Sequence, residues 1–388
     1  MMDLQNDDVR ADLSARGYSR RAIGRVFSLL AAGAAVGPLV APAAYAQTSA
    51  AGAGPRPQPK ALIGANECWE GPLEPGARAA AAAISGGNRY TGSERADFVN
   101  ALASIENVPP AYVMAWPGSS DPLSRIIVTY CSPTRGLVTA DPTFELAESV
   151  AKYIGAPVKR VPLTADHAHD VKAMLAADPN AGIYYVCTPN NPSATLTGLK
   201  DVEWLLANKP AGSIVLLDEA YIHFSDAPAG AYLAAQDKEI IVLRTFSKLF
   251  GMAGMRLGAT IAKPALMMKT MRYDGGMVSY ALPTPSVVCG TASLLAGDLI
   301  RQRRAEMLKV RADTLAFLDK RGLAYVPPQA NFFMVDWKKP AAEVRKAMAA
   351  EGVDIGRSWP IWPTRSRITI GSAAEMDAFK RAVVTLNL

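Results

Sequence analysis

Four short apolar runs, separated by segments of helical periodicity, place the strongest limit on what this 388-residue chain can fold into. Each run is rich in β-branched or aromatic residues, and the runs are GLVTA (136–140), GIYYVC (182–187), SIVLLD (213–218) and EIIVLRT (239–245). Continuous rather than alternating hydrophobicity is typical of strands that are buried on both faces. Helical segments such as 143–156 and 199–209 lie between the runs. The alternation predicts an α/β fold with a mainly parallel sheet wrapped by helices.

The texture of the chain changes after about residue 285, which predicts a second and smaller domain of α+β type. A long amphipathic helical stretch covers 291–322, and short strands are expected at 331–337 and 366–371 with a helix at 341–352 between them. We therefore expect an export signal, a flexible lead-in with an N-terminal arm, a large cofactor-binding domain and a small C-terminal domain, at 1–46, 47–85, 86–285 and 286–388 respectively.

The N-terminus has the pattern of an export signal. Paired arginines in SRRAIGR (19–25) precede an alanine-rich apolar run that ends in Ala44-Tyr45-Ala46, a small-x-small cleavage pattern. The segment resembles a twin-arginine signal, which implies a periplasmic or otherwise exported protein; without a functional signal the protein would be cytoplasmic. Glycines and prolines interrupt the apolar run, so stable membrane insertion is not expected. The alternative is a disordered or helical N-terminal extension.

Charge and cysteine usage exclude two classes of function. The 41 basic and 35 acidic residues give a net charge of +6 without a basic block, so nucleic-acid binding is not expected. The four cysteines are far apart without a CxxC motif, and there are only three histidines, so no metal site is expected. The even number of cysteines leaves disulfides open for an exported protein.

Polar and aromatic side chains follow the predicted strands at the points where the strands end. Phe144 follows the first apolar run, Asn191 the second, Asp218 and Tyr221 the third, and Lys248 the fourth. In an open α/β sheet the carboxyl ends of parallel strands meet at one edge, where ligands bind. We therefore expect these side chains to converge on one site.

Together these groups suit a phosphorylated aromatic aldehyde with a pyridine nitrogen. Lys248 can condense with the aldehyde, and Asp218 can keep the pyridine nitrogen protonated so that the ring accepts electrons. Tyr221 and Asn191 can bond the phenolic oxygen of the ring, and Phe144 can stack on its face. This chemistry is that of pyridoxal 5'-phosphate.

The phosphate of such a ligand needs hydrogen-bond donors at the other end of the site. PGSSDPLSRII (117–127) predicts a glycine turn that leads into a helix N-terminus, where Ser119 and Ser120 and the helix dipole favour an anion. Thr245, Ser247 and Arg256 lie in the loop that carries the lysine and can add hydroxyl and guanidinium contacts.

At these residues the chain resembles the fold-type I aminotransferases, and most closely their histidinol-phosphate aminotransferase-like branch. The motifs that carry the resemblance span about residues 60–375: GANECWEGP, NRYTGSE, TPNNPSAT, LLDEAY, RTFSKLFGMAGMRLG and SRITIG. The resemblance implies a sheet of seven-stranded type and a homodimer in which Tyr90 reaches the cofactor of the partner. It also implies that Arg367 binds the substrate α-carboxylate, that Asn66 and Asn331 line the substrate side, and that Arg357 contacts the substrate.

The predicted reaction is the transfer of an amino group between an amino acid and a 2-oxo acid, with Lys248, Asp218 and Tyr221 as the catalytic residues. Two alternatives remain open: an oxidase, lyase or decarboxylase that uses the same cofactor, and a catalytically silent scaffold. Trp359 and Trp362 lie close to Arg357 in the sequence, which suggests that this region recognises a substrate side chain without a phosphate. Export would likewise favour an amine other than histidinol phosphate.

Overall fold

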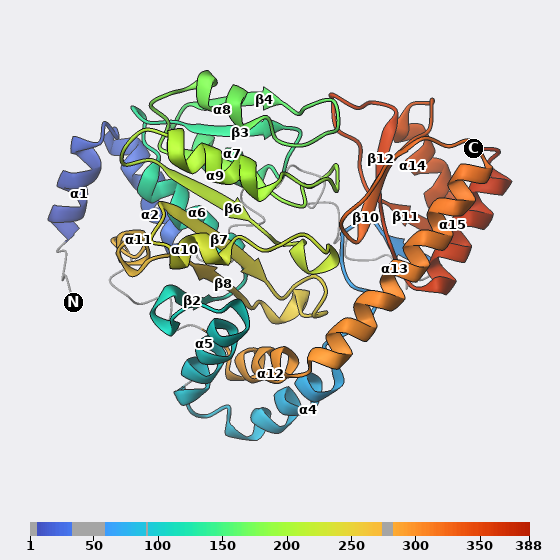
Figure 1. Cartoon of the computed structure of the whole chain (residues 1–388), viewed down its shortest axis with the longest axis horizontal. Coiled ribbons are helices and arrows are strands. Elements are labelled where there is room, and N and C mark those ends of the chain that lie inside the picture. The colour runs from blue at the N-terminus through green and yellow to red at the C-terminus, as the bar shows by residue number, and fades with distance from the viewer. Residues whose placement is uncertain (1–5, 33–58, 91, 274–281) are drawn as a thin grey trace, which may run out of the picture.

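A seven-stranded sheet forms the centre of the larger part of the molecule (Figure 1). The computed structural model describes residues 6–32, 59–90, 92–273 and 282–388. The strands, in the order in which they lie in the sheet, are β2 (Val113–Trp116), β8 (Gly258–Ile261), β7 (Ile240–Thr245), β6 (Ile214–Asp218), β5 (Ile183–Cys187), β3 (Leu137–Asp141) and β4 (Val158–Pro162). Among these strands, only β8 runs in the direction opposite to the others. The predicted mainly parallel α/β sheet is confirmed.

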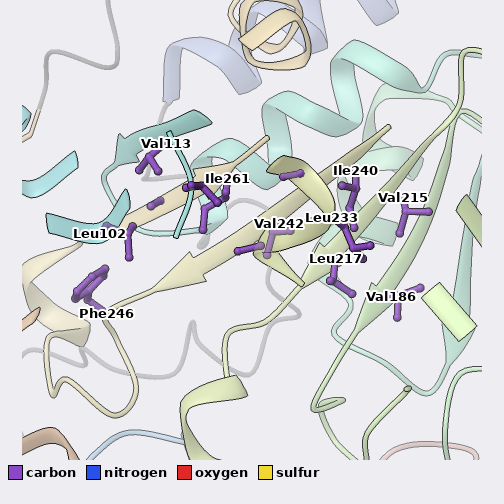
Figure 2. Close-up of a cluster of buried hydrophobic side chains, with 14 of the residues drawn as sticks. Leu102, Val113, Val186, Val215, Leu217, Leu233, Ile240, Val242, Phe246 and Ile261 are labelled. Carbon is purple, nitrogen blue, oxygen red and sulfur yellow. The ribbon is translucent and has the colours of Figure 1, made fainter. Parts of the chain in front are cut away.

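The central strands are apolar up to their polar carboxyl ends because helices cover both faces of the sheet. In β6, Val215 and Leu217 belong to one core cluster and Ile214 and Leu216 to the other, as the two-residue period of a strand requires. Figure 2 shows Val215 and Leu217 among the buried side chains of the first cluster. Two separate cores therefore hold the sheet rigid beneath its carboxyl edge.

Each face of the sheet is covered by its own set of helices. The first core cluster contains residues of α5 (Ser93–Glu106), α8 (Val171–Ala177), α9 (Leu199–Asn208), α10 (Ala231–Ala235) and α12 (Thr284–Leu295). The second contains residues of α6 (Ser120–Tyr130), α7 (Leu146–Ile154) and α11 (Pro264–Thr270). Helix α4 (Glu74–Ala83) packs on α12 outside the sheet, at the lower edge of Figure 1.

The C-terminal part has two small sheets with a core of their own. Strands β12 (Arg365–Thr369), β10 (Phe332–Asp336) and β9 (Tyr325–Val326) form an antiparallel sheet, and β1 (Ala61–Ile63) pairs in parallel with β11 (Val353–Ile355). Helices α14 (Ala341–Ala350) and α15 (Ala373–Thr385) cover them, and Ser372 and Glu375 form a capping box that starts α15.

The single helical stretch expected over 291–322 is wrong at one residue. Ala296 has a ψ of 51°, outside the helical region, and separates α12 from α13 (Gly297–Lys320). The break has a packing reason, because α12 contributes to the core under the large sheet while α13 runs across to the C-terminal part (Figure 1). A continuous helix could not follow both directions.

Residues 6–32 form two helices that dock on the large domain, at the left of Figure 1. Helix α1 (Asn6–Ala15) and helix α2 (Arg20–Ala32) bury Leu13, Ile23 and Val26 in the second core cluster, beside α6 and α7. The paired arginines at 20 and 21 stay exposed. The expected cleavage pattern at 44–46 and residues 47–58 of the lead-in lie outside the described residues.

Hydrogen bonds from Arg16 join the two N-terminal helices to the C-terminal end of α6. The guanidinium of Arg16 donates hydrogen bonds of 2.9, 2.8 and 2.7 Å to the carbonyls of Val128, Thr129 and Cys131 at the C-terminal end of α6. These carbonyls have no partner within the helix, and a cation there also opposes the helix dipole. Across the described part of the chain, no helix is both long and apolar enough to cross a membrane.

Candidate active site

A cavity of about 210 Å³ lies at the carboxyl edge of the large sheet. It receives side chains from the ends of β5, β6 and β7, and from the segments that follow β2 and β3. Most of the predicted cofactor residues line it, namely Ser119, Ser120, Phe144, Asp218, Tyr221, Thr245, Ser247, Lys248 and Arg256. The structure therefore brings together residues that are separated by more than a hundred positions in the sequence. The residues that complete the lining without having been predicted are Ala65, Glu67, Cys187, Ala220 and Ala253.

Asp218 is the last residue of β6 and is 3% exposed. Its carboxylate accepts a hydrogen bond of 2.8 Å from the hydroxyl of Tyr185 and one of 3.1 Å from the backbone N–H of Ala220. Burial raises the pKa of Asp218, while these hydrogen bonds and the charge of Lys248 act in the opposite direction. A protonated pyridine nitrogen would give this buried carboxylate the charged partner that favours its ionised form.

Tyr185 was missed by sequence reasoning. It lies on β5, next to β6 in the sheet, within a run whose continuous hydrophobicity indicates only a buried strand. Its hydroxyl was the available signal, because a buried tyrosine hydroxyl usually finds a hydrogen-bond partner.

Lys248 follows β7 and points its amine toward the ring of Tyr221, with 5.5 Å between Nζ and the ring centroid. The pKa of Lys248 is lowered to about 8, first by burial in the cavity and then by the positive charges of Arg367 and Arg256, against the opposing charges of Glu67 and Asp218. A substantial share of the amine is therefore neutral near physiological pH, and only the neutral amine can attack an aldehyde.

The opposite end of the cavity is built to hold an anion. Helix α6 begins at Ser120 with Ser119 as its N-cap, so the N-terminal N–H groups of an 11-residue helix face this end. Gly118 has a φ of +85°, and a Cβ there would lie 2.3 Å from Nη2 of Arg256. Any other residue would be strained at this φ, and its Cβ would clash with the guanidinium. Only glycine therefore allows both this turn and this position of Arg256.

Hydroxyl groups complete the cradle beside Arg256. Its Nη1 donates to the carbonyl of Ala253 at 3.0 Å and to Oγ of Ser247 at 3.4 Å, and the hydroxyl of Thr245 donates to Ser247 at 3.0 Å. A guanidinium, two hydroxyls and a helix N-terminus are the donors that a phosphate group requires. The residues present fit the phosphorylated pyridoxal cofactor that the sequence predicts.

The predicted substrate residues meet between the small sheet and the carboxyl edge of the large sheet. Arg367 on β12 donates to Oδ1 of Asn191 and to the carbonyl of Gly64, both at 2.8 Å. Asn66 donates to the hydroxyl of Tyr221 at 3.1 Å, which leaves that hydroxyl able to donate its own proton. Asn331 donates to the carbonyl of Asn66 at 3.4 Å. Arg367, the expected carboxylate clamp, thus lies one hydrogen bond away from Asn191, one of the predicted ring contacts.

Tyr90 and Arg357 also lie outside the cavity lining, as do Asn66, Asn191, Asn331 and Arg367. Tyr90 is fully exposed and contributes nothing to the site of its own chain. Arg357 forms an ion pair with Glu145 and lies over the ring of Trp359. Within the described residues, no group of three or more His, Cys, Asp or Glu side chains could hold a metal ion. All four cysteines are free.

A buried ion-pair network lies next to the ends of β6 and β7, which carry Asp218 and Lys248. Arg244 on β7 binds both carboxylate oxygens of Glu106 on α5, at 2.8 and 2.9 Å, and also pairs with Glu219. Glu219 directly follows Asp218, and Arg244 lies four residues before Lys248. The network therefore fixes the ends of β6 and β7 relative to each other. The sequence motifs did not predict this network, although Glu219 and Arg244 both lie within them.

Comparison with known proteins agrees with this geometry. A family model described as aminotransferase class I and II matches residues 59–383. The histidinol-phosphate aminotransferase of Symbiobacterium thermophilum is 31% identical over 81% of this chain and 88% of its own length. The aromatic amino acid aminotransferase of Rhodococcus jostii is 33% identical over 82% of this chain and 87% of its own.

Solved structures agree as well. The crystal structure of histidinol-phosphate aminotransferase from Sinorhizobium meliloti, in complex with pyridoxal-5'-phosphate, matches with a TM-score of 0.77 at 25% identity and covers 84% of this chain and 92% of that one. The fold-type I architecture implied by the sequence motifs is confirmed. Since the family model spans most of the sequence and both curated relatives are matched over most of their length, the chain belongs to the aminotransferase class I and II family.

Proposed function

We propose that the enzyme transfers an amino group between an amino acid and a 2-oxo acid with pyridoxal 5'-phosphate as its cofactor. The observation that carries the proposal is that Lys248 and Asp218 face one cavity from neighbouring strand ends, with an anion cradle at Arg256 beyond them. When bound, the cofactor supplies an aldehyde that captures amines and a ring that accepts electrons from Cα of the substrate.

The side chains of the enzyme divide the remaining work. Asp218 keeps a proton on the pyridine nitrogen, and the neutral Nζ of Lys248 takes the proton from Cα of the substrate. Arg367 holds the α-carboxylate with a planar fork of donors, which fixes the orientation of the amino acid. Tyr221 and Asn191 would bond the phenolic oxygen of the ring. These roles require no group from outside the described residues except the cofactor.

A donor and acceptor screen tests the reaction. Purified holoenzyme is given amino acids and 2-oxo acids, and the new amino acid, the oxygen consumed and the ammonia released are all measured. Transfer predicts one new amino acid for each donor used, with neither oxygen uptake nor ammonia release. Oxygen uptake would indicate an oxidase, and carbon dioxide or ammonia release a decarboxylase or lyase. A protein without a yellow, borohydride-reducible chromophore would support a silent scaffold.

We also propose a homodimer in which Tyr90 contacts the cofactor bound by the partner subunit. Full exposure of a tyrosine that lies outside its own cavity supports this arrangement. Tyr90→Ala and Lys248→Ala subunits should each be inactive as homodimers. Mixed dimers should regain activity, because one of their two sites then carries both native residues. Failure of the mixture to regain activity, with the subunits shown to exchange, would contradict a shared site.

Export through a twin-arginine-like signal is the third part of the proposal. It is supported by the pattern at 19–25 and by the exposure of both arginines even though the surrounding helices are docked. A folded enzyme can load its cofactor before export by such a route. Fractionation should find the protein in the periplasm, and replacing Arg20 and Arg21 by lysine should retain it in the cytoplasm. Cytoplasmic native protein would overturn the proposal.

A further inference from the structure

Three side chains form a closed cluster next to the carboxylate clamp. Trp359 donates its indole N–H to Oε1 of Glu145 at 2.7 Å, and the guanidinium of Arg357 pairs with the same oxygen. Cζ of Arg357 lies 4.2 Å from the ring centroid of Trp359, which is only 4% exposed. The ion pair and the stacked ring therefore hold one another in place.

The cluster is connected to the cavity lining through Phe144 and to the expected carboxylate clamp through Arg367. Glu145 directly follows Phe144, which lines the cavity. On the other side, Cζ of Arg367 lies 5.6 Å from the ring of Trp359. The side chain of an amino acid held by Arg367 must leave the clamp past one of these groups, since the opposite end of the cavity is the anion cradle.

The charge of Arg357 is compensated before any substrate arrives. Glu145 and Arg357 are each about 40% exposed, and the pair is neutral as a unit. Arg160, another cation within the electrostatic reach of Glu145, is held by both carboxylate oxygens of Glu148 at 3.0 Å. A substrate phosphate would have to displace Glu145 from Arg357 and then lie next to the freed carboxylate, which repels it.

We propose that Glu145 determines the substrate specificity of the enzyme by neutralising Arg357 and orienting Trp359. The site thereby accepts amino donors with an uncharged, flat side chain and rejects donors with a side-chain phosphate. The inference rests on the proposed aminotransferase function and adds the substrate class to it. Specificity here comes from a repulsive group as much as from an attractive one.

Glu145→Gln tests the assignment in the holoenzyme. The amide can still accept the Trp359 hydrogen bond, but it no longer cancels the charge of Arg357. We expect kcat/KM for histidinol phosphate to rise roughly tenfold while kcat/KM for phenylalanine changes less than about threefold, because one close charge pair is being removed. Glu145→Gln combined with Arg357→Gln should lose the gain. Glu74→Gln, which breaks a Glu–Arg pair on α4, is the matched control and should change neither value.

Binding measurements keep the inference independent of turnover. Calorimetry on the same variants should give a Kd for histidinol phosphate that falls roughly tenfold in Glu145→Gln, with no comparable change for histidinol, which lacks the phosphate. An unchanged preference in both assays, or an equal loss with both donors, would overturn the role of Glu145. Absence of any transfer alongside the altered Kd would instead contradict the proposed reaction and leave the specificity role intact.

Discussion

The hydroxyl of Tyr185 donates a hydrogen bond of 2.8 Å to Asp218 inside the fully buried centre of the sheet. Two neighbouring parallel strands, β5 and β6, carry the donor and the acceptor. The bond favours the ionised carboxylate and so opposes the effect of burial on its pKa. The pKa of the carboxylate that we propose faces the cofactor nitrogen is therefore lowered, against the effect of burial, by a residue that does not line the cavity.

Removing the Tyr185 hydroxyl should raise the pH at which kcat/KM begins to fall as the solution is acidified. In Tyr185→Phe the pKa of Asp218 rises, so the carboxylate is lost at a higher pH as the solution is acidified. At the acid end of the profile we expect kcat/KM to fall roughly tenfold relative to the native enzyme, since a hydrogen bond to a charged group contributes about 1.5–3 kcal/mol. Full pH profiles of kcat/KM measure the effect.

Tyr184→Phe is the control for this change. Tyr184 is the preceding residue on β5, faces the other core cluster and bonds the carbonyl of Asp178. Its removal should affect stability without moving the acid limb. Coincident acid limbs for Tyr185→Phe and the native enzyme would show that the hydrogen bond does not govern Asp218.

The lowered pKa of Lys248 predicts how fast apoenzyme captures its cofactor. The neutral amine is the reactive form, so the rate rises with pH until the pKa of about 8 is passed and then levels off. Between pH 6 and pH 8 the neutral fraction rises about 50-fold, and the capture rate should follow it. Stopped-flow absorbance with borohydride trapping measures the rate. A rate that keeps rising tenfold per pH unit beyond pH 9 would contradict a lowered pKa, and Lys248→Ala should show no capture.

Gly118→Ala should selectively weaken binding of the phosphate group of the cofactor. The new Cβ would meet Arg256 at 2.3 Å, and the φ of +85° disfavours any side chain, so the guanidinium must move away. We expect affinity for pyridoxal phosphate to fall roughly 10- to 100-fold, since charge-assisted hydrogen bonds of about 1.5–3 kcal/mol are lost. Affinity for pyridoxal, which has no phosphate, should change much less.

Fluorescence titration of the apoenzyme with both ligands gives the comparison. Gly254→Ala is the matched control, because a Cβ at Gly254 meets no atom within 4 Å and its φ is ordinary. Equal losses for pyridoxal and its phosphate in Gly118→Ala would mean that the substitution disturbs the whole cavity and not the cradle.

The sequence was sufficient for four of the seven strands of the sheet and for the residues that follow them, because both follow from local patterns. Continuous apolar runs identify β3, β5, β6 and β7, and parallel strands bring Phe144, Asp218 and Lys248 to one edge whatever their distance in the chain. What could not be predicted depends on side-chain direction. Tyr185 looks like core from its neighbours, and nothing local indicates that Glu145 would reach Arg357 across 212 positions.

The N-terminal segment shows the same limit. Its composition indicates an export signal, yet residues 6–32 also have the helical spacing of a docked pair, with Leu13, Ile23 and Val26 buried. Both interpretations use some of the same apolar residues, such as Ile23 and Val26, since a signal and an amphipathic helix can share a composition and differ in what they contact. The break at Ala296 has both a local and a long-range cause, because Gly297, a poor helix former, follows it and the helices on either side pack on different cores.

Arg16 should stabilise the last turn of α6. It donates to three carbonyls there, so Arg16→Ala leaves them without these donors and removes a cation from the negative end of the helix. We expect local opening of 127–131 to become easier by about 2 kcal/mol, which raises amide exchange there roughly 30-fold. Hydrogen exchange of the full chain, followed by mass spectrometry, measures this directly.

Arg20→Ala removes an exposed arginine from the same segment and should leave exchange in α6 unchanged. The N-terminal end of α6, where Ser119 and Ser120 face the cavity, is held by the sheet and by its own core residues, so cofactor affinity should change less than about threefold in Arg16→Ala. Fast exchange in α6 of the native chain itself would contradict docking of the N-terminal helices. A large loss of cofactor affinity would show that α6 transmits the disturbance along its whole length.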